Sequence, residues 1–557
     1  MRAYVVALRM AGIAGALAGA GVGLLRWSWA WPGLSLTAAA ASCALGWLVG
    51  VAVSPALAWG LSRRPKRART GRGERWGRAA STALTVLAMV PGVLWLTMAL
   101  PNGFMRNALG ADRRPGDTRP NLILISIDAL RADHVGEYGN RDGLTPNIDN
   151  FSEEATRYEA AYVASPWTLT SLAAVVTSLA PSECGLKLAA PRMHDWYLYS
   201  AKLPESVPLL HEQLQREGYT TAAELTNCFL TAERGWRRGF DYFRNEDGPE
   251  LGTILTRAAT VTANALAWLR LNRREPFFLW AHYLDPHVPY NAPGTPPELR
   301  ARYPRQWLTR REYWYESMRR RDEDTKARYQ EFCRRMYAEE VRYADRWVGK
   351  LLDGIKEAGL WEDSLIVITA DHGEELFEHE GFEHGHTMHE ELLWVPLLVK
   401  WPEGFNADKC ITQTVALTDL PATVFELVGS RPPAWLKGGP LPRRDGLPGE
   451  AVYSEGILHG VEQTALTTDE YKAIHHAGTR LAEERLEVYA RAGDREEKTD
   501  LAGSDVAMDL RGRLVMRTRA AEEAAKQWKV SHEREFRGID LSRATREKLR
   551  TLGYIGD

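Results

Sequence analysis

The chain has 557 residues, of which 45% are hydrophobic and 25% charged, as in ordinary folded proteins. Its net charge of -2 gives no reason to expect a nucleic-acid partner. The average hides a division, because residues 1–101 are apolar and basic whereas the rest have a mixed composition. The length allows a small membrane region followed by one large domain or two smaller ones.

Three uncharged, apolar runs occupy the N-terminal region. They lie at residues 10–25, 32–61 and 79–101. Since about 20 apolar residues are needed to cross a bilayer, we predict three transmembrane helices within residues 1–101. A cleaved signal peptide is the alternative for the first run alone.

The loop between the second and third runs indicates the orientation. Residues 62–78 are rich in Arg and Lys and contain a single acidic residue, Glu74. Positively charged loops stay in the cytoplasm, and three spans that start inside must end outside. We therefore predict a multi-pass protein of the cell (inner) membrane, with everything after residue 101 in the periplasm or outside the cell.

Residues 102–119 are predicted to form a linker, after which short apolar runs alternate with helical patterns. The runs suited to buried strands are residues 121–127, 277–281, 365–369 and 396–399. Helices are expected from Thr145-Pro146, with Thr as N-cap and Pro in the first turn, and within residues 311–352. This alternation predicts an α/β fold, a mainly parallel sheet flanked by helices, whose sites lie beyond the carboxyl ends of the strands.

Two acidic residues stand where such a site is expected. Asp128 follows the run 121–127, and Asp371, with His372 next to it, follows the run 365–369. One strand-end Asp often only caps a turn, but carboxylates and an imidazole at equivalent strand ends favour a divalent cation. Thr168 precedes an apolar, Ala-rich stretch, which predicts a helix N-terminus where amide donors favour an anionic ester group.

Several segments, in order along the chain, resemble the sulfatase family of the alkaline-phosphatase superfamily. They are RPNLILISIDALRADHVGEYG, PWTLTSLAA, HYLDPHVPY and ITADHGEELFEHEGFEHGH. The resemblance implies an alkaline-phosphatase-like catalytic domain at residues 120–435 and a small C-terminal α+β subdomain at residues 436–557.

The resemblance also implies two overlapping sets of site residues. The metal ligands would be Asp128, Asp371, His372 and Thr168. The catalytic residues would be Thr168 as nucleophile and His287, His384 and His386 as groups that face the substrate. The implied cofactor is a divalent metal ion, with Mn²⁺, Zn²⁺ and Ca²⁺ not distinguished. His379 and His389, nearby in the chain, are expected to be surface residues.

The chain departs from the family pattern at four positions. Sulfatases oxidise a Cys or Ser in a C/S-x-P-x-R motif to formylglycine, whereas this chain has Thr168, Thr170 and Leu172 in that pattern. The methyl group on the Thr Cβ prevents aldehyde formation, so no formylglycine is expected. A Thr nucleophile resembles the phosphoryl-transferring branch, the lipoteichoic-acid synthases and phosphoethanolamine transferases. Ala129 stands where many relatives have an oxygen ligand, which favours one metal ion over two.

Together these features predict a metal-dependent enzyme that acts at the membrane, outside the cytoplasm. It would cleave sulfuric or phosphoric esters, or transfer a phosphoryl group through Thr168, on a lipid or polysaccharide substrate. The alternative is a catalytically inactive, membrane-tethered sulfatase-like binding protein, which the residues Ala129 and Leu172 favour.

Overall fold

The computed structural model describes residues 118–186, 201–245, 257–272, 276–304, 307, 321–478 and 483–531. The chain divides into two units, Met1–Pro101 and Asn102–Asp557, and every described residue belongs to the second. The three predicted membrane helices therefore lie outside the described residues. Among the helices that are described, none is both long enough and apolar enough to span a bilayer.

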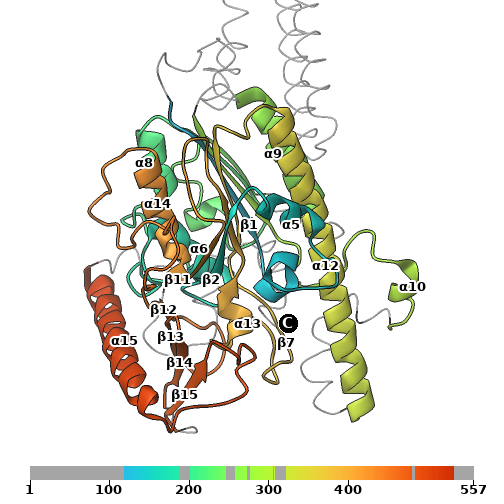
Figure 1. Ribbon diagram of the computed structural model, residues 1–557, viewed down its shortest axis with the longest axis vertical. Coiled ribbons are helices and arrows are strands. Elements are labelled where there is room, and N and C mark those ends of the chain that lie inside the picture. Colours follow the sequence, from blue (N-terminus) through green and yellow to red (C-terminus); the bar gives the residue numbers. More distant parts are fainter. Residues whose placement is uncertain are drawn as a thin grey trace, which may run out of the picture. The chain divides into compact units, whose positions relative to one another are not determined.

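The main structural element is a nine-stranded sheet in the order β11-β2-β10-β6-β1-β5-β3-β4, with β9 paired to β2 (Figure 1). Its strands are β1 (Asn121–Ile127), β2 (Thr156–Tyr162), β3 (Thr220–Leu225), β4 (Tyr242–Asn245), β5 (Phe277–Tyr283), β6 (Ser364–Ala370), β9 (Trp394–Val395), β10 (Leu397–Lys400) and β11 (Cys410–Ala416). The strand β1 pairs in parallel with β5 and β6, and β5 pairs in parallel with β3. The prediction of a mainly parallel sheet is confirmed, although β10 runs antiparallel to β6 and β2.

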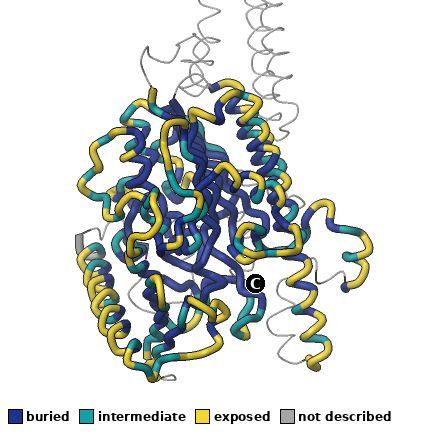
Figure 2. Tube along the Cα trace, viewed as in Figure 1, coloured by how far each residue is buried: buried dark blue, intermediate teal, exposed yellow. Residues whose placement is uncertain are grey.

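Helices cover both faces of this sheet (Figure 1). One group is α5 (Pro146–Ser152), α9 (Ala258–Asn272) and α12 (Glu323–Glu357), and the other is α6 (Thr168–Thr177), α8 (Leu210–Arg216) and α14 (Leu420–Leu427). All seven residues of β1 are buried, as expected for a continuous apolar strand between two helical layers. Figure 2 shows the sheet as the buried centre of the molecule, with the exposed residues on loops and outer helix faces.

The two predicted helices are present with adjusted ends. The first is α5, which has Thr145 at its N-cap and Pro146 at its first position. The second, α12, begins at Glu323 because the Asp322 side chain accepts a hydrogen bond from the amide of Thr325 at 3.0 Å. Residues 311–320, the start of the predicted range, lie outside the described part of the chain.

A second, four-stranded antiparallel sheet follows towards the C-terminus. It consists of β12 (Val452–Ser454), β13 (Gln463–Thr467), β14 (Tyr471–His476) and β15 (Arg485–Ala490), and α15 (Asp505–Ser531) packs against it. Alternate residues of these strands face opposite sides, so that Leu466 and Val488 pack towards α15 whereas Ala465 and Ile474 join the main core. This sheet and helix have the α+β composition expected for the C-terminal subdomain, and the boundary at residue 436 remains a prediction.

The remaining short elements lie in connections. They are α10 (Pro297–Arg300), α13 (Glu390–Leu393) and the hairpin of β7 (Glu375–Leu376) and β8 (Phe382–Glu383). The segment from β7 to α13 carries most of the histidines singled out in the sequence.

Candidate active site

The two acidic residues predicted from strand ends lie side by side. Asp128 follows β1 directly and Asp371 follows β6 directly. The two strands are parallel neighbours with Ile127 opposite Ala370, so both carboxylates emerge at the same edge of the sheet. Both residues are completely buried.

Each of these carboxylates has one oxygen held by donors and one oxygen without a donor. Oδ1 of Asp371 accepts hydrogen bonds from the amides of Ala129 at 3.1 Å and His372 at 2.9 Å. Oδ2 of Asp128 accepts from the side-chain amide of Asn227 at 2.7 Å. Within the described part of the chain, Oδ1 of Asp128 and Oδ2 of Asp371 have no hydrogen-bond partner. A buried anionic oxygen without a donor is costly, and a cation between these two oxygens would offset that cost.

His372 supplies a third lone pair at the same point. Its Nδ1 lies 2.8 Å from the carbonyl oxygen of Gly373, which can only accept, so Nδ1 carries the hydrogen and Nε2 of the neutral ring keeps its lone pair. Nε2 lies 3.6 Å from Oδ1 of Asp128 and 3.5 Å from Oδ2 of Asp371. Two carboxylate oxygens and one imidazole nitrogen are a donor set that fits a divalent transition-metal ion, and their ligand atoms lie within 4.8 Å of one another.

The electrostatics of the two carboxylates differ. Burial, followed by the nearby charge of Asp128, raises the pKa of Asp371 to about 6. Burial also acts to raise the pKa of Asp128, but His287 and a hydrogen bond from His282 hold that pKa below its ordinary value. Two carboxylates so close together in a dry site repel one another unless a cation lies between them.

Thr168 lies next to this cluster as the first residue of α6. It is fully buried, and its hydroxyl oxygen lies 3.2 Å from Nε2 of His372 and 3.4 Å from the side-chain amide nitrogen of Asn227. Trp167, the N-cap, provides no side-chain cap, so the first amides of the helix are available to an anionic group. The Ser171 hydroxyl donates to the carbonyl of Asp371 at 2.5 Å and so ties the first turn of α6 to the end of β6.

Two of the other three predicted histidines lie beside the cluster. The His384 ring centroid is 4.3 Å from that of His372 and 4.8 Å from that of His287. Nδ1 of His384 donates to Glu374 at 3.0 Å, and Nδ1 of His287 donates to the carbonyl of Val288 at 2.6 Å. These bonds set the orientation of both rings.

His386 is placed differently. Its Nε2 lies 2.7 Å from Oε2 of Glu375, and its side chain is 26% exposed. In the described residues, the hydrogen bonds of this ring are with Glu375 rather than with Thr168 or His384. The structure therefore brings together six of the seven predicted site residues, whereas His386 pairs with Glu375 of the neighbouring hairpin.

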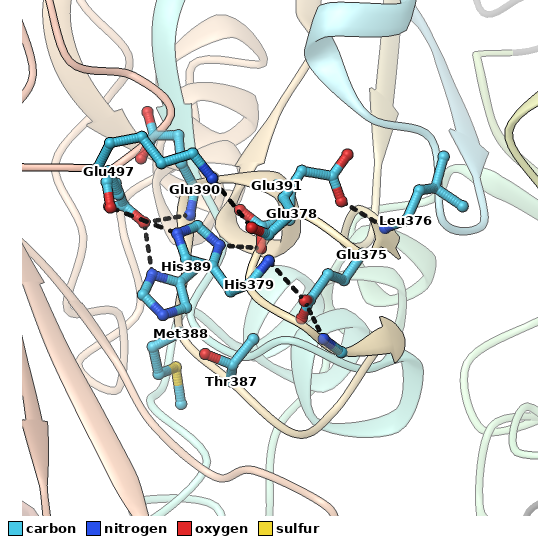
Figure 3. A network of polar contacts seen from close by, with 12 residues as sticks. Glu375, Leu376, Glu378, His379, Thr387, Met388, His389, Glu390, Glu391 and Glu497 are labelled. Atoms are coloured by element: carbon cyan, nitrogen blue, oxygen red, sulfur yellow. Dashed lines mark hydrogen bonds and ion pairs between the residues drawn. The ribbon is translucent and has the colours of Figure 1, made fainter. Parts of the chain in front are cut away.

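The expectation that His389 is a surface residue is wrong, and His379 is only partly exposed. Their rings stack with centroids 3.7 Å apart and planes 4° from parallel (Figure 3). Nδ1 of His389 lies 2.8 Å from Glu497, and Nδ1 of His379 lies 2.9 Å from Glu391. Glu497 belongs to a distant part of the chain, so the local sequence around the histidines could not indicate their burial.

In Figure 3, His379 and His389 are each paired with a carboxylate, and the contacts form a continuous network of polar interactions. Glu497 pairs with the fully buried Lys472 at 2.9 Å as well as with His389. Burial acts to raise the pKa of Glu497, but Lys472 and then His389 lower it to about 2. The network joins the segment that carries His384 to the C-terminal sheet, because Lys472 lies on β14.

Sequence reasoning missed two residues that contact the cluster, Asn227 and His282. Asn227 comes two residues after β3, so the strand-end rule would have found it if the run TTAAEL had been recognised as a strand. His282 is a polar residue inside the otherwise apolar strand β5, and its Nε2 lies 3.5 Å from Oδ2 of Asp128. A lone polar residue in a fully buried strand was the available signal.

Comparison with known proteins identifies the family of this chain. Residues 120–430 match the family model named Sulfatase. The Delta 4,5-hexuronate-2-O-sulfatase of Bacteroides thetaiotaomicron is 26% identical over 348 residues, which cover 57% of this chain and 69% of that protein. Arylsulfatase K of Bos taurus is 24% identical over 390 residues, which cover 62% of this chain and 70% of that protein.

Solved structures share the fold at lower sequence identity. The structure of BT4656 in complex with its substrate D-glucosamine-2-N,6-O-disulfate has a TM-score of 0.56 and 18% identity, and the match covers 73% of this chain and 98% of that one. The phosphonate monoester hydrolase of Agrobacterium radiobacter also has a TM-score of 0.56, with 16% identity over 73% of this chain and 96% of that one.

The fold, with its polar cluster at the carboxyl edge of the sheet, is an α/β architecture shared with these solved structures. The match of the family model over more than half of the chain shows that the chain belongs to the sulfatase family, and so to the alkaline-phosphatase superfamily. Its class of activity is therefore that of a sulfatase-family hydrolase.

Proposed function

We propose that this protein is a metal-dependent ester hydrolase that uses Thr168 as its nucleophile on sulfuric or phosphoric esters. One observation carries the proposal. Three buried lone-pair atoms, from Asp128, Asp371 and His372, converge next to the Thr168 hydroxyl at the N-terminus of α6. When bound, a divalent cation supplies positive charge that favours an ionised hydroxyl and neutralises the ester oxygens.

Each residue of the site then has a separate role in the reaction. Thr168 Oγ1, with its proton released to solvent, forms a bond to the sulfur or phosphorus atom, while the bond from that atom to the ester oxygen breaks. His287 or His384, in its protonated form, donates a proton to the departing oxygen, because both rings lie beside His372 in fixed orientations. Water then attacks the sulfur or phosphorus atom and gives one proton to the same ring, the bond to Thr168 Oγ1 breaks, and Oγ1 takes a proton back from solvent. The amides at the start of α6 and the side chain of Asn227 orient the anionic group.

The substrate class follows from the relatives and remains a proposal. A hexuronate sulfatase and a structure with a bound glucosamine disulfate suggest sulfated sugars, whereas a phosphonate monoester hydrolase suggests phosphorus esters. The purified full-length protein, treated with chelator and reloaded separately with Mn²⁺, Zn²⁺ or Ca²⁺, should be assayed on matched aryl sulfate, phosphate and phosphonate monoesters. We expect turnover of at least one ester only in metal-loaded protein. Metal binding without turnover of any ester would favour the inactive binding protein instead.

We also propose that the hydrolase is anchored in the cell membrane and faces the outside of the cytoplasm. The support is the three apolar runs within residues 1–101 and the basic loop at residues 62–78. A phosphatase reporter fused after Asp557, which is active only outside the cytoplasm, should be active in cells. A second fusion placed in the basic loop should be inactive. Activity of the loop fusion, or inactivity of the fusion after Asp557, would contradict the three-span arrangement.

A further inference from the structure

A line of three buried polar side chains leads from the middle of the sheet to Asp128. Trp280 and His282 lie on the same face of β5, and Ser126 lies opposite His282 on β1. All three are at most 1% exposed. The indole nitrogen of Trp280 lies 2.8 Å from Oγ of Ser126, and the same oxygen lies 2.8 Å from Nδ1 of His282.

The chemistry of these groups determines the direction of the hydrogen bonds. The Trp280 indole can only donate, so it occupies an acceptor position on the Ser126 oxygen. In the described part of the chain, the only other side-chain partner of Ser126 is Nδ1 of His282. The Ser126 oxygen has a second acceptor position, but a hydrogen on Nδ1 of a neutral ring would leave the lone pair of Nε2 facing the carboxylate of Asp128. The arrangement in which the Ser126 hydroxyl donates to Nδ1 avoids this repulsion and is therefore favoured. A neutral imidazole that accepts at Nδ1 carries its hydrogen at Nε2.

The hydrogen on Nε2 of His282 faces Oδ2 of Asp128 at 3.5 Å. That is the oxygen that Asn227 also holds, whereas Oδ1 of Asp128 is the one without a donor. A nitrogen that carries a hydrogen cannot bind a metal through its lone pair, so in this form His282 faces the carboxylate with its hydrogen and is not a ligand. Asn227 donates a hydrogen bond to Oδ2, and the contact of His282 with the same oxygen is electrostatic and longer than a hydrogen bond. Both contacts lie on Oδ2, which leaves Oδ1 turned towards His372.

We propose that His282 is a positioning residue of the metal site: the line from Trp280 through Ser126 holds it in the Nε2-protonated form, in which it orients Asp128. This inference rests on the proposed function, because the orientation matters only if Asp128 binds a cation. Residues that orient metal ligands commonly change metal affinity by 10- to 100-fold when replaced, roughly the effect expected here.

The test measures binding of Mn²⁺ and of Zn²⁺ by calorimetry on chelator-treated, full-length protein. We expect His282→Leu to weaken the affinity by about 10- to 100-fold, and Ser126→Ala by about 3- to 10-fold, because the ring then loses the donor that sets its tautomer. His282→Gln keeps an N–H donor at a similar reach and should stay within about threefold of the wild type. His211→Leu is the matched control, since His211 is also fully buried but lies away from the cluster, stacked on Phe240.

Activity gives a second readout that a purely structural defect would not produce. At saturating metal, turnover of His282→Leu should recover to within about tenfold of the wild type, because the variant still has the metal ligand Asp128 and the nucleophile Thr168. Wild-type affinity in folded His282→Leu and Ser126→Ala would overturn the positioning role and leave the proposed function intact. A loss in His282→Gln as large as that in His282→Leu would make His282 a direct ligand instead. A wild-type protein that binds none of the metals would overturn both proposals.

Discussion

Replacing Thr168 by valine is expected to lower turnover by roughly 10³- to 10⁵-fold, the range typical of a lost nucleophile. The Thr168 hydroxyl is fully buried, lies 3.2 Å from Nε2 of His372 and stands at the first turn of α6. No other hydroxyl of the described residues is hydrogen-bonded to Nε2 of His372. The measurement is single-turnover kinetics on the best ester, with metal present at saturation.

Two features of this substitution make the result decisive. Valine has nearly the shape of threonine, so it fills the buried position without leaving a cavity, and Asp128, Asp371 and His372 remain to hold the metal. The matched variant Thr168→Ser retains the hydroxyl and should keep turnover within about 100-fold of the wild type. If Thr168→Val turns over at the wild-type rate, Thr168 is not the nucleophile, and a water molecule must attack instead.

Replacing Asp371 by asparagine is expected to weaken divalent-metal affinity by about 100-fold or more and to abolish metal-dependent turnover. The amide oxygen can still accept the two backbone hydrogen bonds now made to Oδ1. An NH₂ group replaces Oδ2, the oxygen that has no donor and faces His372. The substitution therefore removes a ligand while it preserves the local hydrogen bonds.

Thermal unfolding with and without metal provides the measurement. At a free metal concentration 100 times its Kd, the wild type should gain about 2.7 kcal/mol of stability, whereas a variant with a 100-fold weaker site should gain only about 0.4 kcal/mol. Without metal, Asp371→Asn should unfold at a higher temperature than the wild type, because it no longer places a second carboxylate beside Asp128. A substitution that stabilises the metal-free protein but removes the stabilisation by metal is typical of a residue at a functional site.

The control for this experiment is Asp345→Asn. Asp345 is also a buried carboxylate whose pKa is raised to about 6, mainly by burial, but it accepts hydrogen bonds from the first amides of α5. It belongs to none of the three groups in the described residues that could hold a metal. Its replacement should leave the metal-induced stabilisation unchanged. Full metal-induced stabilisation in Asp371→Asn would remove Asp371 from the ligand set.

Four strands of the main sheet and the residues of the candidate metal site could be predicted from the sequence because their signals are local. The run NLILISI is apolar throughout, and it forms a strand buried on both faces at the predicted residues. Asp128 and Asp371 follow such runs directly, and Thr168 precedes an apolar helix. In a parallel sheet, these local positions share one edge, so their meeting followed from the fold class alone.

Which histidine rings lie at the candidate site, and which are buried elsewhere, depends on tertiary contacts that the local sequence does not show. His384 and His386 are two residues apart in one segment, yet one ring stacks near His372 while the other pairs with Glu375. His389 is buried because Glu497, far along the chain, reaches it.

By itself, the sequence determined the family and the predominantly parallel α/β sheet. It also indicated that Asp128, Thr168, Asp371 and His372 come together at one edge of that sheet. Both follow from hydrophobic pattern and strand-end position, which are properties of short segments. The tertiary structure alone decided the strand order and the antiparallel direction of β10. It also decided the placement of Asn227 and His282 beside Asp128. The reason is physical: a short apolar run records that it will be buried, but not its direction or its neighbours, which depend on how the whole chain packs.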